Sequence, residues 1–189
     1  MSSINCIISK LKASGNKDLA FEVLASEEPT KEMIDFYESR TKQHRDRVKK
    51  NIKRIIQEKK GIPAELLRER AETHDISKYS KDEYIPYVWL SWWYKENNSG
   101  REFVYPKYIK DKVNKATEHH IRTNKHHPEF YSNTKDMTKL DIAEMVADWA
   151  SMSQELKNNL KEWVKDNIDK WGFSKDQVNL IYDFVSVFE

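Results

Sequence analysis

The sequence is poor in cysteine, glycine and proline. It contains a single cysteine, Cys6, with 4 glycines and 5 prolines among 189 residues. One cysteine excludes an intrachain disulfide framework and favours a reducing compartment, so we expect a cytoplasmic protein. Because β-sheets need frequent turns, which glycine and proline supply, their scarcity favours an all-α fold.

Long apolar runs and a strong charge of one sign are also missing. The most apolar stretch, 88–94, is flanked by charged residues, and it is much shorter than the roughly 20 residues of a membrane-spanning helix. The run from Ile4 to Ile8 is too short for a signal-peptide core. The formal net charge is only +2. We therefore expect no membrane partner, and nothing in the charge indicates a nucleic acid.

The length and composition predict one helical domain over residues 1–189. A chain of this length can bury a sizeable core. The residues that are candidates for a functional site lie at about 30–153, whereas 1–28 and 154–189 are expected to be covering helices. Within the first covering segment, 3–27 is predicted to form one or two short helices, and Asn16 is a candidate cap.

The last part of the chain predicts two amphipathic helices. The second of them starts at a capping box that Ser174 and Gln177 form. These helices contain no histidine. We assign them to packing, with a homodimer surface as the alternative.

A long helix is predicted from Pro29 and Thr30 to Lys60, and Gly61 ends it. Its apolar stripe follows steps of three, four and seven: Met33, Tyr37, His44, Val48, Ile52, Ile55 and Ile56. His44 inside this stripe is either a core histidine with a polar partner or a metal ligand on a rigid helix. The opposite face is basic and includes Arg45; it is either a solvated face or, near His44, a phosphate site.

The next helix begins at Pro63 and leads to His74-Asp75. His74 follows Leu67 and Ala71 at helical steps, so it should face the core. A neighbouring nitrogen and carboxylate oxygen suit manganese, iron, cobalt, nickel or zinc. The alternative is a helix end with two exposed polar residues. A loop is expected at 77–80, followed by a helix over 81–97 whose tryptophans form core or a pocket wall.

Four of the 6 histidines lie within nine residues: His119, His120, His126 and His127. A helix from Pro106 should place His120 on its apolar face, with Ile109 and Val113. His119 is rotated from that face by about 100°, so we expect it nearer the rim. Pro128 is expected to end the local helix at His127.

Three interpretations of this histidine cluster are open: it binds metal, it holds substrate, or it forms a polar surface loop. We expect His120 and one of His126 or His127 to point into the same cavity as His44.

Another helix should begin at Thr138 or Asp141. Asp141, Glu144 and Asp148 are stacked on it at helical steps. Three like charges on one side need a positive partner. A metal centre and the basic face of the long helix are the two candidates.

The order of His44, His74-Asp75 and Asp148 resembles the HD-domain superfamily of metal-dependent phosphohydrolases. The resemblance covers roughly residues 30–153 and implies an HD-domain-like helical bundle with a central metal site, in which these four residues bind one metal. The added histidines resemble the branches with two metals, which implies His120 and His127 as further ligands, with His119 and His126 as the alternatives.

Two local segments carry the resemblance further. His74-Asp75-Ile76-Ser77-Lys78 is similar to the His-Asp-x-x-Lys element of cyclic-dinucleotide phosphodiesterases, where the lysine helps to handle phosphate. The glycine-tyrosine-proline signature of those enzymes is absent, so their substrate is not carried over. The segments 119–129 and 141–151 look closer still to an uncharacterised family of HD-type proteins from bacteria and phages.

The resemblance implies one or two divalent transition-metal ions and hydrolysis of a phosphoester or phosphoanhydride in a nucleotide-like small molecule. The residues expected to act in catalysis are Lys78, Asp75 and Glu129. Those expected to bind the phosphate are Lys78, Arg122, Lys125 and Arg45. Glu118 or Glu129 is expected to orient the histidines. The alternatives are an HD-type di-iron oxygenase and a non-catalytic module that keeps a metal for folding or interaction.

Overall fold

The computed structural model describes residues 28–189, and every regular element in this part of the chain is a helix, with no strand. The expected all-α fold is therefore confirmed. The α-helices are α3 (Lys31–Glu58), α4 (Ala64–Thr73), α5 (Tyr84–Asn98), α6 (Lys107–Thr123), α7 (Lys139–Leu156), α8 (Leu160–Asn167) and α9 (Lys175–Val185). Short 3-10 helices join them: η1 (Ile76–Tyr79), η2 (Pro128–Phe130), η3 (Thr134–Asp136), η4 (Ile168–Trp171) and η5 (Ser186–Phe188). The helices and the Asn16 cap predicted for 3–27 fall outside the described residues.

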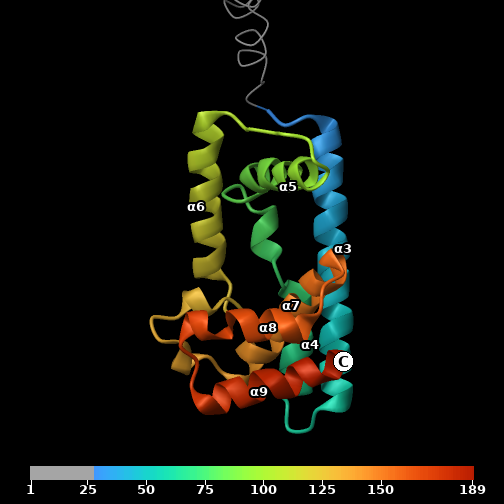
Figure 1. Cartoon of the computed structure of the whole chain (residues 1–189), viewed down its shortest axis with the longest axis vertical. Helices are drawn as coiled ribbons and strands as arrows, with labels where there is room; N and C mark the ends of the chain where they lie inside the picture. The colour runs from blue at the N-terminus through green and yellow to red at the C-terminus, as the bar shows by residue number, and fades with distance from the viewer. Residues whose placement is uncertain (1–27) are drawn as a thin grey trace, which may run out of the picture.

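The helices form an elongated bundle (Figure 1). α3 and α6 run along the two sides of the upper part, and α5 lies across the space between them. α8 and α9 cross the lower part. α7 packs along α3 and also contacts α4 and α9. α7 is therefore the central helix of the lower part.

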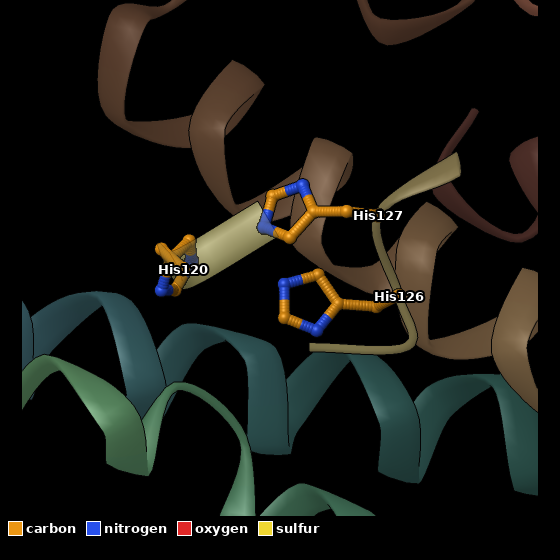
Figure 2. A group of neighbouring side chains, drawn as sticks. All are labelled: His120, His126 and His127. Atoms are coloured by element: carbon orange, nitrogen blue, oxygen red, sulfur yellow. The ribbon is translucent and has the colours of Figure 1, made fainter. Parts of the chain in front are cut away.

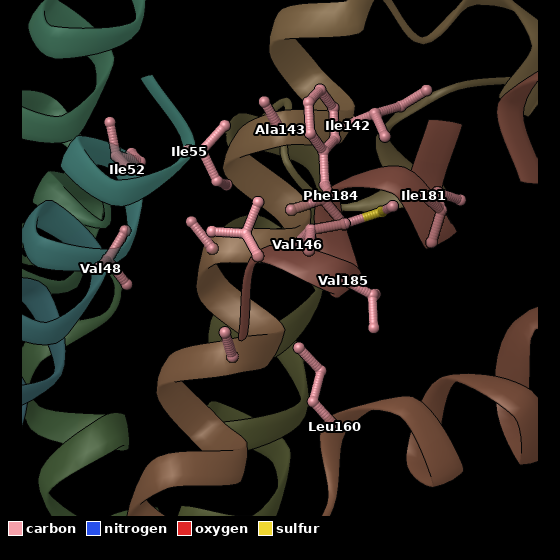
Figure 3. Packing of buried hydrophobic residues seen from close by; sticks show 14 of the residues in the cluster. Val48, Ile52, Ile55, Ile142, Ala143, Val146, Leu160, Ile181, Phe184 and Val185 are labelled. Atoms are coloured by element: carbon pink, nitrogen blue, oxygen red, sulfur yellow. The ribbon is translucent and has the colours of Figure 1, made fainter. Parts of the chain in front are cut away.

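The larger apolar core surrounds α7. Val48, Ile52 and Ile55 of α3 face this helix from one side, and residues of α9 such as Phe184 face it from the other (Figure 3). Most α7 side chains from 142 to 147 are fully buried. Because α7 is enclosed on several sides, its few polar side chains must find partners inside the protein.

A second apolar cluster lies in the upper part of the bundle. It joins the first turns of α3 to α5 and α6 through Met33, Tyr37, Val88, Trp89, Ile109 and Val113. His44 lies on α3 between Tyr37 of this cluster and Val48 of the larger one. The polar centre described below is therefore built where the two apolar cores meet.

Several predicted helix ends are confirmed. Thr30 caps α3 by accepting a hydrogen bond from the Met33 amide. Gly61 adopts a positive φ of 70° after the helix, but α3 ends at Glu58, two residues before the predicted Lys60. The predicted capping box of Ser174 and Gln177 is present at the start of α9. Thr138 forms a second capping box with Asp141 at the start of α7.

Other predicted boundaries differ from the structure. α6 ends at Thr123 rather than His127, because the Asn124 side chain donates to the His120 carbonyl at 2.8 Å and the backbone turns extended there. Pro128 instead opens the short helix η2. The expected loop at 77–80 is mostly the 3-10 helix η1.

Candidate metal centre

The turn at His74-Asp75 makes two neighbouring side chains converge. α4 ends at Thr73, and Asp75 then adopts a left-handed backbone with φ 56° and ψ 22°. Aspartate is one of the few residues other than glycine that visits this region readily. Arg45 stabilises the turn by donating to the carbonyl oxygens of Glu72 at 2.7 Å and His74 at 2.9 Å. These carbonyls lie at the end of α4, where no helical partner is available.

The first group of polar side chains consists of His44, His74, Asp75 and Asp148. His44 Nε2 lies 3.0 Å from Asp148 Oδ1 and 3.2 Å from Asp75 Oδ2. His74 Nε2 lies 3.4 Å from His44 Nε2 and 3.6 Å from each of the same two carboxylate oxygens. The structure thus brings together the four residues that the sequence order singled out. That they bind a metal stays a prediction.

The second group lies on the other side of Asp75. His120 Nε2 and His126 Nε2 are 3.3 Å and 3.5 Å from Asp75 Oδ1. The ring of His127 is close to both, with centroid distances of 4.9 Å to His120 and 4.3 Å to His126 (Figure 2). One ring nitrogen from each of these three histidines lies within 4.8 Å of the others.

His119 does not join the second group. Its side chain is 38% exposed, and its Nδ1 lies 2.8 Å from a carboxylate oxygen of Glu83. The structure therefore places His119 at the rim and His120 inside, as the helix rotation predicted. His126 and His127 both enter the centre.

Two buried polar atoms in the centre have no hydrogen-bond partner: Asp75 Oδ1 and His127 Nε2. Burial opposes ionisation of Asp75, but the positive charges of Lys78 and His74 beside it hold its pKa well below the usual value. Burial, together with the neighbouring His126 and His120, lowers the pKa of His127 to about 3. A carboxylate and a neutral imidazole are the forms that bind metal.

These donors fit a metal ion. A buried polar atom without a partner is costly, and coordination satisfies it. Mixed nitrogen and oxygen ligands suit borderline divalent metals. The buried histidine and aspartate clusters could therefore hold a metal ion.

Buried carboxylates orient the histidines. Glu83 holds His120 Nδ1 at 2.9 Å, and Glu144 holds His74 Nδ1 at 2.8 Å. The expectation that Glu118 or Glu129 has this role is wrong, because Glu118 pairs with Arg122 and Glu129 accepts a hydrogen bond from Trp171. Sequence periodicity gave no signal for Glu83, which lies just before α5. Helical spacing marked Glu144 only as one of three acidic residues stacked on the same helix.

Two of the three stacked acids of α7 have a positive partner that was not expected. Arg70 of α4 pairs with Asp141 at 2.5 Å and with Glu144 at 2.7 Å. Asp148 faces the histidines of the first group instead. The basic face of α3 is not the partner of Asp141 or Glu144, because Arg70 of α4 pairs with both.

Among the predicted phosphate-binding residues, Lys78 lies in the centre. Its ammonium group is 2.6 Å from Asp75 Oδ2, and its side chain is 19% exposed. The Arg45 guanidinium donates to the backbone carbonyls of the His74-Asp75 turn. Arg122 pairs with Glu118 on the exposed surface, and Lys125 is exposed.

A protein-family model matches residues 33–187. The family is DUF5662, a family of unknown function. This chain belongs to that family. The segment that matches DUF5662 spans all residues of both groups, from His44 to Asp148. No curated protein and no solved structure matched the chain.

None of the helices described is long and apolar enough to cross a membrane.

Proposed function

We propose that this protein is a metal-dependent phosphohydrolase of HD type that acts on a phosphoester or phosphoanhydride of a nucleotide-like small molecule. The observation that carries the proposal is the position of Asp75. Its Oδ2 faces His44 and His74, whereas its Oδ1 faces His120 and His126. One buried carboxylate thus joins two groups of nitrogen ligands.

Each group offers a set of ligands for one divalent ion. The first set is His44, His74, Asp75 Oδ2 and Asp148; the second is Asp75 Oδ1, His120, His126 and His127. Manganese, iron, cobalt, nickel and zinc suit these donors. A divalent ion supplies a water of lowered pKa and polarises a phosphoryl oxygen, and a pair of ions suits in-line displacement at phosphorus.

Residues of the chain add the charge and the orientation that such a reaction needs. Lys78 places a partly exposed ammonium beside the first group, where it can compensate negative charge on a substrate phosphate. The Ser151 hydroxyl lies 3.1 Å from His44 Nδ1, and the Arg47 guanidinium donates to the same hydroxyl at 3.2 Å. These contacts orient His44 so that its Nε2 points into the centre.

The test is turnover of a panel of nucleoside mono-, di- and triphosphates and simple phosphodiesters. Protein without a His tag is loaded with Mn²⁺, Co²⁺, Ni²⁺ or Mg²⁺. We expect release of phosphate or nucleotide with a transition metal, loss of turnover on chelation, and recovery when the metal is restored. Turnover no greater than that of the Asp75→Asn variant on every substrate would contradict the proposal. Coloured, iron-containing protein in that case would favour the oxygenase alternative.

Replacing Lys78 with methionine is expected to lower kcat/KM by about 10²- to 10³-fold, which is typical for loss of one charge-stabilising donor. The metal content should stay unchanged, because the ammonium is not a ligand. Lys81→Met is the matched control, since Lys81 is exposed three residues further along. Steady-state kinetics and elemental analysis of both variants check this. Equal activity of the two variants would remove Lys78 from the reaction.

A further inference from the structure

Two buried carboxylates contact four histidines, three in the centre and His119 at its rim, and all four contacts involve Nδ1. Glu83 lies against His119 and His120, and Glu144 lies against His74 and His126. The side chain of Glu83 is fully buried, and Glu144 is 4% exposed. A histidine that donates its Nδ1–H to a carboxylate keeps Nε2 as the free nitrogen for a metal.

The two carboxylates use their oxygens differently. Glu83 gives one oxygen to each histidine: Oε1 to His119 at 2.8 Å and Oε2 to His120 at 2.9 Å. Glu144 uses Oε1 for both of its histidines, with His74 Nδ1 at 2.8 Å and His126 Nδ1 at 3.4 Å. Its other oxygen, Oε2, accepts from Arg70 Nε at 2.7 Å.

Every neighbour of Glu144 must therefore be a donor. A guanidinium can only donate, and a histidine that ligates through Nε2 carries its proton on Nδ1. An ionised carboxylate accepts at both oxygens, so it is the side chain that satisfies all three neighbours at once. The ion pair with the Arg70 guanidinium at 2.7 Å favours the ionised carboxylate.

Glu144 is itself held in place from the opposite side. Arg70, which donates to it, also donates through Nη1 to Asp141 at 2.5 Å. Asp141 in turn accepts from the backbone amide and the hydroxyl of Thr138, at 2.7 Å and 2.6 Å. A continuous set of hydrogen bonds thus runs from the cap of α7 through Arg70 to the histidines.

The histidines that Glu144 contacts belong to different groups. His74 is part of the first group and follows α4, whereas His126 is part of the second and lies in the segment between α6 and η2. Glu83, in contrast, contacts one inner histidine, His120, and one rim histidine, His119.

The geometry points to Glu144, anchored by Arg70, as a positioning residue that orients one histidine of each group at the same time, whereas Glu83 orients His120 alone. This inference rests on the metal centre of the proposed function and not on the hydrolysis. It assigns the coupling between the two groups to a residue that contacts neither substrate nor metal.

The same substitution at the two carboxylates separates their roles. In Glu144→Gln, the amide NH₂ must face either Arg70 or the two histidines. If it faces Arg70, two donors oppose each other. If it faces the histidines, it opposes their Nδ1–H groups or forces their protons onto Nε2. In Glu83→Gln, the amide oxygen can still face His120 while the NH₂ faces His119, whose tautomer is unconstrained. Both variants remove one buried charge, so each is a matched control for the other.

The experiment measures binding of Zn²⁺ alone by elemental analysis and titration, with no substrate present. We expect Glu144→Gln to lose about 10- to 100-fold in affinity for both ions, the range found for outer-sphere partners of metal-bound histidine. Glu83→Gln should weaken one ion only, and by less. If the two carboxylates only stabilised the fold, both variants would have a similarly lowered thermal midpoint and equal affinities for the metal.

A second pair of variants keeps the inference testable if Glu144→Gln does not fold. Arg70 is 23% exposed in its side chain and Arg68, on the same helix, is 54% exposed and pairs with Glu65. Arg70→Gln should weaken both ions, and Arg68→Gln should weaken neither. Equal zinc affinities for Glu144→Gln and Glu83→Gln, or for the two arginine variants, would overturn the inference and leave the proposed function standing. Wild-type protein that binds no Zn²⁺, Mn²⁺ or Co²⁺ would overturn both.

Discussion

Replacing Asp75 with asparagine is expected to empty both groups of metal and to lower phosphohydrolase activity by more than about 100-fold, the upper range for loss of an outer-sphere partner alone. Asp75 turns one carboxylate oxygen toward each group. A neutral amide presents one uncharged oxygen where two ionised oxygens stood, so one group loses its Asp75 ligand and the other keeps only a weaker, uncharged one. Asparagine tolerates the left-handed backbone that this position requires, so the turn itself should persist.

Elemental analysis of metal per chain and kinetics on the best substrate of the panel measure this effect. Asp82→Asn is the matched control, because Asp82 is exposed in the segment between η1 and α5. Circular dichroism shows whether the helical content of Asp75→Asn is unchanged. Retention of a full metal complement by a folded Asp75→Asn protein would contradict the shared role of this carboxylate.

Replacing Phe184 with alanine is expected to lower the free energy of unfolding by about 3–5 kcal/mol, the usual cost of truncating a fully buried phenylalanine. Phe184 has no exposed surface and packs in the core that surrounds α7 (Figure 3). Truncation leaves a cavity that neighbouring side chains fill only in part. Urea unfolding of the wild type and the variant, with the metal removed from both, measures the difference.

Leu156→Ala is the control for this prediction. Leu156 is also a large apolar residue but is 55% exposed, so its truncation should change stability by no more than about 0.5 kcal/mol. A loss below about 1 kcal/mol in Phe184→Ala would mean that α9 is not essential to the packing of α7.

Much of the helical framework was predictable because its signals are local. The stripe on α3 and the capping residues Thr30 and Ser174 depend on side chains only a few positions apart. The same period placed His44 and His120 on faces that turn inward, and the structure finds both buried. The boundary at Pro128 failed because the rule considered proline alone, whereas Asn124 bonds back to the helix end and stops α6 earlier.

The candidate ligands were predictable in part. The order of His44, His74-Asp75 and Asp148 was enough to single them out, and the structure brings both imidazoles to within 3.6 Å of the two carboxylates. The sequence left open which histidines of the second cluster enter the centre. Both His126 and His127 do, because the chain turns back after α6.

By itself, the sequence determined that the protein is helical, which faces its helices bury, and which histidines and aspartates were candidates for a metal centre. Only the tertiary structure decided how these candidates are held. Glu144 lies 70 residues from His74 in the chain, Glu83 lies 36 residues from His119, and Arg70 lies 74 residues from Glu144. Helical periodicity relates residues three and four apart. The partner of a buried charge, by contrast, is set by which helices pack against each other and therefore appears only in the folded chain.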